Sequence, residues 1–280
     1  MRFQVLLTAP SQSRLGSLFA RLGYAVALGA VMLVLPSGAH AQGRGGRGGP
    51  PRSAKESAPF DLTGYWVAVV TEDWRFRMVT PPKGDFPGVP LNPAGRTVAN
   101  AWDPAKDEAA GNQCKGYGGA ALMRVPSRFH ITWQDDNTLK VEADAGTQTR
   151  LLHFGAAKAP AGPASVQGYS AAEWAPALGG RGGRGGQGQP GGVAQRGGSL
   201  KIVTTNLSPG YLQKNGVPYS EQTTVTEWID IVNEPDGEQW LIDKIIVEDP
   251  QYLARPYITS PNFKKQRDAS GWNPTACTVR

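Results

Sequence analysis

Apolar and polar residues alternate along several short segments of this 280-residue chain, which is the pattern of strands with one buried face. Phe129, Ile131 and Trp133 share one face of such a strand, with polar side chains between them. Comparable runs predict strands at residues 63–71, 74–79, 128–133, 139–143, 147–154, 166–174, 200–206, 223–232 and 239–248. Most of these runs follow one another closely, so neighbouring strands are expected to pair in antiparallel fashion.

Two short helices are predicted between the first hairpin and Gly111. Asn92 and Asp103 are each followed by proline, and a capping side chain before a proline is typical of a first helical turn. The predicted fold is therefore mainly β with one or two short helices. We expect an antiparallel β-barrel of eight or nine strands, with a β-sandwich as the alternative, because closing the sheet leaves no exposed edge.

Residues 1–41 have the features of a secretory signal peptide. Arg14 and Arg21 precede an apolar run over residues 24–35, and Ala39 and Ala41 form a small-residue cleavage site. Cleavage near Ala41 predicts a bacterial protein that is secreted or periplasmic. The remaining sequence has no run of the roughly 20 apolar residues that a membrane-spanning helix needs, so no transmembrane segment is expected in the mature chain.

The mature chain is expected to be one folded domain with two glycine-rich tracts. Residues 42–58 are predicted to form a disordered tether, residues 59–280 a single barrel-like domain, and residues 179–198 a disordered Gly/Arg-rich loop within it. Three arginines lie in the signal peptide and six in the tracts, so the formal charge of +6 falls to about −3 for the remainder. Because the tracts lack interleaved aromatic residues, no nucleic-acid partner is predicted.

The chain contains two cysteines, Cys114 and Cys277. Exported proteins fold in an oxidising compartment, so we predict one disulfide that ties the C-terminal tail to the domain. Two buried thiols are the alternative. The sequence contains no zinc spacing, phosphate-binding loop or dinucleotide motif, so no metal or cofactor is predicted.

The last predicted hairpin contains the most informative charged pair. If its turn consists of Pro235 and Asp236, Glu227 lies opposite Lys244. The other opposed pairs would be Val225 with Ile246, Ile229 with Ile242, and Ile231 with Trp240. Glu227 and Lys244 would then be a polar pair on an apolar face, which is compatible with a small-ligand site inside the barrel or with a structural ion pair.

An ordered set of motifs resembles a group of exported bacterial proteins of unassigned activity. In that group a cysteine is followed by a Gly-Arg-His segment, a serine and tryptophan segment, a valine–threonine strand, a Pro-x-Ser turn, a strand with glutamate and an Asp-Pro. The corresponding residues here are Cys114, Gly146 with Arg150 and His153, Ser170 with Trp174, the strand at 200–207, Pro218 to Ser220, Thr226-Glu227 and Asp249-Pro250.

The chain departs from that pattern at Trp228, where an arginine commonly follows the glutamate, and in the separation of Gly146 from Arg150. The resemblance implies export and a coherent fold, and it implies no substrate. Separately, Gly64-Tyr65-Trp66 resembles the Gly-x-Trp motif of the lipocalin and calycin barrels.

Three functions are compatible with these features. The leading hypothesis is a binding module whose barrel holds a small, partly apolar ligand. The candidate ligand-binding residues are Trp66, Arg150, Tyr169, Tyr219, Glu227 and Lys244. One alternative is a hydrolase or isomerase that uses Glu227 as acid or base with Arg150 as charge stabiliser, and another is an envelope scaffold with a filled barrel. The sequence indicates neither the ligand nor the oligomeric state.

Overall fold

The structure is a computed structural model, and it describes residues 52–280 apart from 87, 156–158, 160 and 177–197. The predicted signal peptide, most of the predicted tether and nearly all of the predicted glycine-rich loop lie outside the described residues.

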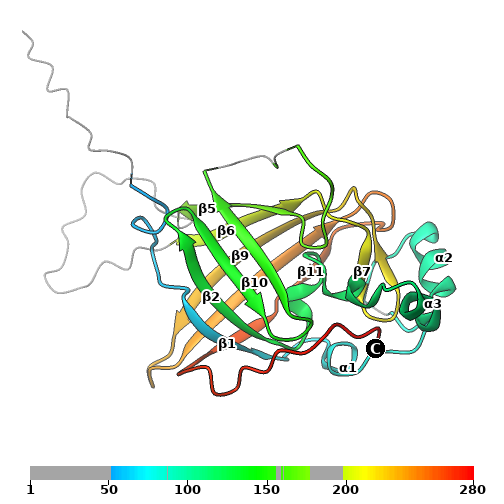
Figure 1. The fold of residues 1–280 in the computed structure, drawn as a ribbon, viewed down its shortest axis with the longest axis horizontal. Coiled ribbons are helices and arrows are strands. Elements are labelled where there is room, and N and C mark those ends of the chain that lie inside the picture. Colours follow the sequence, from blue (N-terminus) through cyan, green and yellow to red (C-terminus); the bar gives the residue numbers. More distant parts are fainter. Residues whose placement is uncertain (1–51, 87, 156–158, 160, 177–197) are drawn as a thin grey trace, which may run out of the picture. The chain divides into compact units, whose positions relative to one another are not determined.

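Nine strands of the described residues close into a β-barrel (Figure 1). They are β1 (Gly64–Val69), β2 (Arg128–Asp135), β3 (Thr138–Ala143), β4 (Gln148–Phe154), β5 (Tyr169–Pro176), β6 (Gly198–Thr205), β9 (Thr224–Asn233), β10 (Gln239–Glu248) and β12 (Asn262–Gln266). Around the ring the order is β10-β12-β1-β2-β3-β4-β5-β6-β9, and β9 pairs with β10 to close it. Neighbouring strands are antiparallel except β4 and β5, which are parallel.

The other elements lie outside this ring. They are the helices α1 (Trp74–Met78), α2 (Pro93–Ala101) and α3 (Pro104–Ala109), the 3₁₀ helices η1 (Gln113–Tyr117) and η2 (Leu122–Arg124), and the strands β7 (Gly210–Gln213), β8 (Val217–Tyr219) and β11 (Tyr257–Thr259). Strand β11 pairs with β10, and β7 pairs with β8 in a separate two-stranded sheet. In Figure 1 the α-helices and β7 gather at one end of the barrel.

The predicted class, an antiparallel β-barrel with a few short helices, is confirmed. Both predicted helices are present as α2 and α3, and their predicted caps are formed. The Asn92 side chain accepts a hydrogen bond from Gly95 N at 2.9 Å, and the Asp103 side chain accepts one from Ala105 N at 3.0 Å. These caps satisfy backbone N–H groups that have no partner within the helix.

The prediction of a strand at residues 74–79 is wrong, because Trp74–Met78 forms helix α1. Its inward contact is polar, since Arg77 Nε donates to the Arg124 carbonyl oxygen at 2.8 Å. Trp74 and Met78 are 67% and 58% exposed. The alternating apolar residues therefore do not mark a buried face here.

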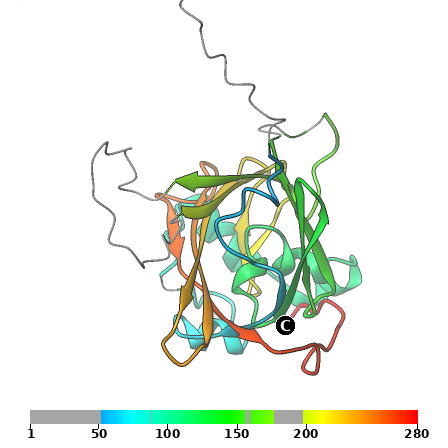
Figure 2. The same cartoon turned by 90° about the vertical axis from the view of Figure 1, so that its left-hand side faces the viewer.

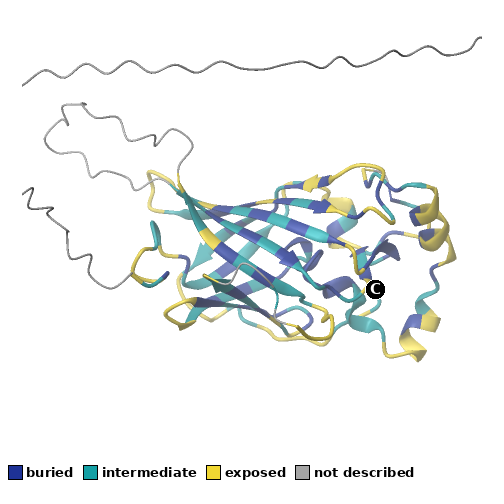
Figure 3. Ribbon diagram, turned by 90° about the horizontal axis from the view of Figure 1, so that it is seen from above, coloured by how far each residue is buried: buried dark blue, intermediate teal, exposed yellow. Residues whose placement is uncertain are grey.

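Large apolar side chains fill the barrel interior. Alternate residues along the strands are buried, as the banding in Figure 3 shows, because successive side chains of a strand lie on opposite faces of the sheet. The largest of these side chains, each no more than 1% exposed, are Trp66, Phe129, Phe263, Leu139, Leu200, Ile202 and Leu241. The Trp66 indole N–H donates to the Leu62 carbonyl oxygen at 2.9 Å. In the described part of the chain, the middle of the barrel is a packed core.

Residues 53–60 cross the end of the barrel that lies opposite the helices, and Figure 2 shows that end face-on. The Trp174 indole N–H donates to the Ala54 carbonyl oxygen at 2.8 Å. Lys55 N donates to the Asp136 carbonyl oxygen at 3.1 Å. Residues 53–58, which the sequence assigned to the tether, therefore pack against the barrel.

The register of the β9–β10 hairpin differs by one residue from the predicted one. Glu227 pairs with Ile245, and Lys244 pairs with Trp228. A one-residue slip moves every side chain of a strand to the opposite face. Lys244 therefore lies on the outer surface, with Nζ 4.4 Å from the centre of the Trp228 ring. The prediction that Glu227 faces Lys244 is wrong.

The hairpin turn explains this difference, because it has three residues, 235–237, and not two. Glu234 N donates to the Glu238 carbonyl oxygen at 2.8 Å, and Gly237 N donates to the Glu234 carbonyl oxygen at 3.0 Å. Gly237 has a φ of 86°, which is the left-handed residue expected after a type I turn in a three-residue loop. Strand β10 carries apolar residues on both faces, so the alternation of apolar and polar residues could not determine the register.

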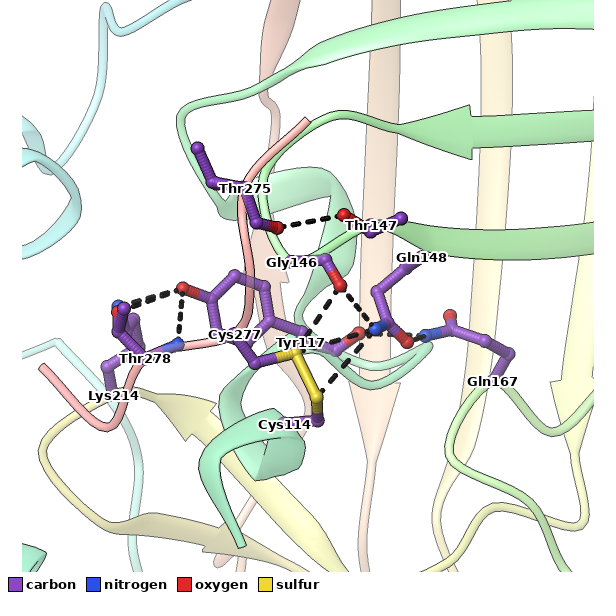
Figure 4. The surroundings of a disulfide bond; sticks show 10 residues. All are labelled: Cys114, Tyr117, Gly146, Thr147, Gln148, Gln167, Lys214, Thr275, Cys277 and Thr278. Atoms are coloured by element: carbon purple, nitrogen blue, oxygen red, sulfur yellow. Dashed lines mark hydrogen bonds between the residues drawn. A yellow bond between two sulfur atoms is a disulfide. The ribbon is translucent and has the colours of Figure 1, made fainter. Parts of the chain in front are cut away.

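Cys114 and Cys277 form the predicted disulfide (Figure 4). Hydrogen bonds support the tail on both sides of it: Thr278 N donates to Tyr117 Oη at 3.3 Å, and Thr147 Oγ1 donates to the Thr275 carbonyl oxygen at 2.9 Å. The disulfide and these bonds together fasten the C-terminal tail to the domain.

Candidate functional site

A buried ion pair inside the barrel joins β4 and β9, which β5 and β6 separate in the ring. Arg150 of β4 and Glu227 of β9 have side chains that are 2% and 1% exposed. Arg150 Nη1 donates to Glu227 Oε1 at 2.9 Å, and Nη2 donates to Glu227 Oε2. The pair is therefore bidentate, which is the strongest arrangement of guanidinium and carboxylate.

Two hydroxyl groups complete the surroundings of the guanidinium. Arg150 Nε donates to Ser170 Oγ of β5 at 2.9 Å, and Nη2 donates to Thr204 Oγ1 of β6 at 2.6 Å. The two hydroxyl oxygens are 2.8 Å apart. Burial alone lowers the pKa of Arg150, but the charge and hydrogen bonds of Glu227 outweigh it and raise that pKa above its ordinary value. Arg150 is therefore positively charged in the core.

Asp243 adds a second carboxyl group to this network. It lies on β10, is 0% exposed, and neither of its oxygens has a hydrogen-bond donor among the described residues. Burial and then the charge of Glu227 raise the pKa of Asp243 well above its ordinary range, although Arg150 opposes them. A protonated Asp243 can donate its O–H to Glu227, and the three side chains then carry no net charge. The raised pKa means that the folded protein binds a proton on Asp243 more tightly than the unfolded chain does.

This proton makes stability depend on pH in a definite direction. The unfolded chain releases the Asp243 proton near pH 4, whereas the folded chain keeps it to higher pH. The folded state thus binds more protons above about pH 4, so this contribution to the free energy of unfolding is complete below that pH and declines as the pH rises. We expect Asp243→Asn, which keeps a permanent N–H donor beside Glu227, to remove the decline.

Urea unfolding between about pH 4 and about pH 8 measures this effect. Asp230→Asn is the control, because Asp230 lies on the exposed face of the adjacent strand β9. We expect the control to follow the wild-type pH dependence and Asp243→Asn to gain stability relative to it as the pH rises. If the free energy of unfolding changed with pH in the same way in the wild type and both variants, Asp243 would be ionised in the folded state.

The motifs that carry the family resemblance meet in this core. Arg150, Ser170, Thr204 and Glu227 come from four of these motifs, and each places one polar group in the buried network. Two further motifs meet at Asp249: Ser220 N and Ser220 Oγ donate to its carboxylate oxygens at 2.6 and 3.0 Å. Thr223 Oγ1 donates to the same carboxylate at 2.8 Å. The motif residues are thus parts of two buried polar contacts.

The structure brings together two of the six residues that the sequence proposed for a ligand site, Arg150 and Glu227. Trp66 and Tyr219 are core residues that are 0% and 1% exposed. Tyr169 stacks on His153 with ring centres 4.9 Å apart, and Lys244 is exposed on the outside. The six residues therefore do not line one ligand site.

A large cleft opens at the mouth of the barrel that residues 53–60 cross. The ladder between β1 and β2 ends where Gly64 pairs with Ile131, and β2 continues beyond that pair to Asp135. The cleft beside this extension has a volume of about 810 Å³. Its lining consists of four apolar residues, five polar or charged residues and one glycine: Ala58, Phe60, Ile131 and Trp133; Lys55, Asp61, Thr63, His130 and Thr132; and Gly64.

Four aromatic rings form a connected group at this mouth. Phe60 meets Trp174 edge-on with ring centres 5.5 Å apart, Trp174 contacts Phe154 at 5.1 Å, and Phe154 contacts Trp133 at 5.6 Å. Phe60, Trp133, Phe154 and Trp174 are only partly buried, although they pack against the core. Sequence reasoning did not identify this group, because Phe60 and Trp133 are far apart in the chain.

No family model, curated protein or solved structure matches the chain. Among the described residues, no three side chains of the His, Cys, Asp and Glu types gather as metal ligands. None of the described helices combines the length and the hydrophobicity needed to cross a bilayer.

Proposed function

We propose that the chain is an exported binding module that takes a small, partly apolar molecule in the mouth cleft. The observation that carries this proposal is the cleft itself, with about 810 Å³ of space beside the rings of Phe60 and Trp133. Ligand sites commonly occupy a few hundred to about 1,000 Å³, with apolar walls and a few polar groups. The packed centre of the barrel offers no comparable support for a ligand.

The part of β2 that extends beyond its ladder with β1 supplies hydrogen-bonding groups for such a ligand. Ala68 N donates to the Ser127 carbonyl oxygen at 2.9 Å, so alternate residues of β2, up to Trp133, direct their backbone groups towards β1. Trp133 lies beyond the end of the β1–β2 ladder. Its N–H and carbonyl therefore face the cleft, and a ligand with an amide or similar polar group complements them.

The disulfide supports the proposal that the chain is exported. Cys114 and Cys277 are bonded, and structural disulfides belong to oxidising compartments. We propose that residues 1–41 direct secretion or transport to the periplasm and are removed near Ala41.

Native mass spectrometry of the protein purified from its host tests the binding function. We expect an added mass on the wild type and a loss of that mass in Trp133→Leu, with affinity for the same molecule weakened by about tenfold. Trp228→Leu is the matched control, because Trp228 contacts Lys244 on the outer surface. An added mass retained in Trp133→Leu, or a bare wild-type mass, would contradict the proposal, and the bare mass would favour a scaffold.

A hydrolase or isomerase based on Glu227 has weaker support. Glu227 and Arg150 do converge, but they bond to each other in the packed core with side chains that are 1% and 2% exposed. A substrate would have to reach a carboxylate that already has its partner.

A further inference from the structure

A small cavity lies between helix α1, the two 3₁₀ helices and the end of β7. We call it the Arg77 pocket; the residues used below are Arg77, Gly116, Arg124 and Lys214, all of which line it. Its volume is about 40 Å³, and a single water needs about 10–15 Å³. The pocket therefore has room for about three waters or for one small polyatomic ion.

Arg77 is a charged side chain whose hydrogen-bonding capacity is mostly unused. It is 9% exposed, and its Nε donates to the Arg124 carbonyl oxygen at 2.8 Å. Nη1 and Nη2 are buried and have no hydrogen-bond partner among the residues that the structure describes. A buried guanidinium without an acceptor carries a large desolvation cost. We therefore expect these two atoms to donate hydrogen bonds to an acceptor that is not part of the chain.

The nearby carboxylates are already paired with the other arginine. Arg124 Nη1 donates to Glu72 at 3.1 Å, and Arg124 Nη2 donates to Asp73 at 3.0 Å. Burial, and then the positive charge of Arg124, lower the pKa of Arg77 to about 10, although Glu72 and Asp73 act in the opposite direction. Arg77 is thus a cation at neutral pH, and its Nη atoms lack a bonded counter-charge.

A second cation lines the same pocket without a carboxylate of its own among the described residues. Lys214 Nζ donates to Tyr117 Oη at 3.0 Å and to Thr278 Oγ1 at 2.7 Å, and both acceptors are neutral hydroxyls. The stem of Lys214 lies close against Gly116, where an added Cβ would be only 2.9 Å from Lys214 Cγ. The absence of a side chain at Gly116 therefore leaves space for the stem of Lys214 beside the pocket.

We propose that the Arg77 pocket binds a small oxyanion, namely phosphate, sulfate or a carboxylate group, between Arg77 and Lys214. An anion of this kind gives the Arg77 Nη atoms the acceptors that they lack, and it would lie beside the Lys214 side chain that lines the same pocket. The site is separate from the mouth cleft, so this inference stands or falls independently of the proposed ligand-binding function.

Thermal unfolding of the full mature chain tests the site. Phosphate, sulfate and acetate are titrated separately, with chloride added to hold ionic strength constant, because an ion that binds the folded state raises Tm with its concentration. We expect the Tm of the wild type to rise with the concentration of at least one oxyanion and to reach a plateau. A preference for the tetrahedral ions would identify phosphate or sulfate as the natural group, and a preference for acetate would identify a carboxylate.

Variants assign the effect to the pocket. Arg77→Met should weaken binding by at least about tenfold, and Lys214→Gln by about fivefold. Arg75→Met is the matched control on the same helix, because the Arg75 side chain is 64% exposed and pairs with Asp85; it should bind as wild type does. If Arg77→Met does not fold, calorimetric titration of Lys214→Gln against Arg75→Met decides the question.

Two results would overturn the inference. One is a wild-type Tm that does not respond to any of the three oxyanions at constant ionic strength. The other is an equal response in Arg77→Met, Lys214→Gln and Arg75→Met, which would assign the effect to general ion exclusion and leave water as the content of the pocket.

Discussion

Replacing Arg150 with methionine is expected to lower the free energy of unfolding by about 3–5 kcal/mol. The substitution removes the only cation that bonds to Glu227 among the described residues, while the Glu227 side chain stays 1% exposed. Ser170 and Thr204 lose their donor at the same time. An uncompensated carboxylate in a packed core is much more costly than the loss of an attraction at the surface.

Urea denaturation near neutral pH, followed by circular dichroism, measures this loss. Lys201→Met is the matched control, because Lys201 forms a comparable 2.9 Å pair with Glu173 on the outside of the barrel, where the side chains are 34% and 64% exposed. We expect a loss below about 1 kcal/mol for this control.

A double variant separates the charge effect from lost packing. Arg150→Met combined with Glu227→Met removes both members of the pair, while the burial that raises the pKa of Asp243 remains. It should recover much of the stability lost in the single variant, because apolar groups can replace a buried ion pair without great cost. Equal small losses for Arg150→Met and Lys201→Met would show that water reaches the interior pair.

More of the fold than of the candidate site could be predicted from the sequence. Alternation located β2, which contains Phe129 and Trp133, and the caps at Asn92 and Asp103 located α2 and α3, because these signals are local. The strand β12 escaped prediction, since Phe263 is its only apolar residue and its place in the ring depends on pairing with β1 and β10. Such pairing is a property of the closed barrel and not of the segment.

The buried network shows how the length of the β9–β10 turn determines which residue of β10 enters the core. Asp243 and Lys244 are neighbours on a strand that is apolar on both faces, so either could point inward. The three-residue loop ending in Gly237 selects Asp243. Had that loop been recognised, alternation would have placed Asp243 beside Glu227 and Lys244 outside.

The Arg77 pocket and the mouth cleft lay beyond sequence reasoning for a different reason. Both depend on segments outside the barrel ring: α1, the 3₁₀ helices and β7 in one case, and residues 53–60, which lie beside β2, in the other. Hydrophobic periodicity predicts regular elements, and it carries no information on where a connecting segment packs.

Removal of the disulfide by Cys114→Ala with Cys277→Ala is expected to lower the free energy of unfolding by about 5 kcal/mol on the chain-entropy account. The cysteines are 163 residues apart in sequence, so the bond closes a loop over more than half of the 280-residue chain. The hydrogen bonds that also hold the tail, such as that from Thr278 N to Tyr117 Oη, exist only in the folded state, so they do not restrict the unfolded chain as the disulfide does.

Urea unfolding of the oxidised wild type, the reduced wild type and the double alanine variant measures this contribution. Reduction should lower the wild-type stability towards that of the variant and should leave the variant unchanged, which separates the bond from the effect of losing two sulfur atoms. A loss below about 1 kcal/mol in both comparisons would mean that the unfolded chain is already compact around this loop, because the entropic gain depends on the freedom that the open loop has.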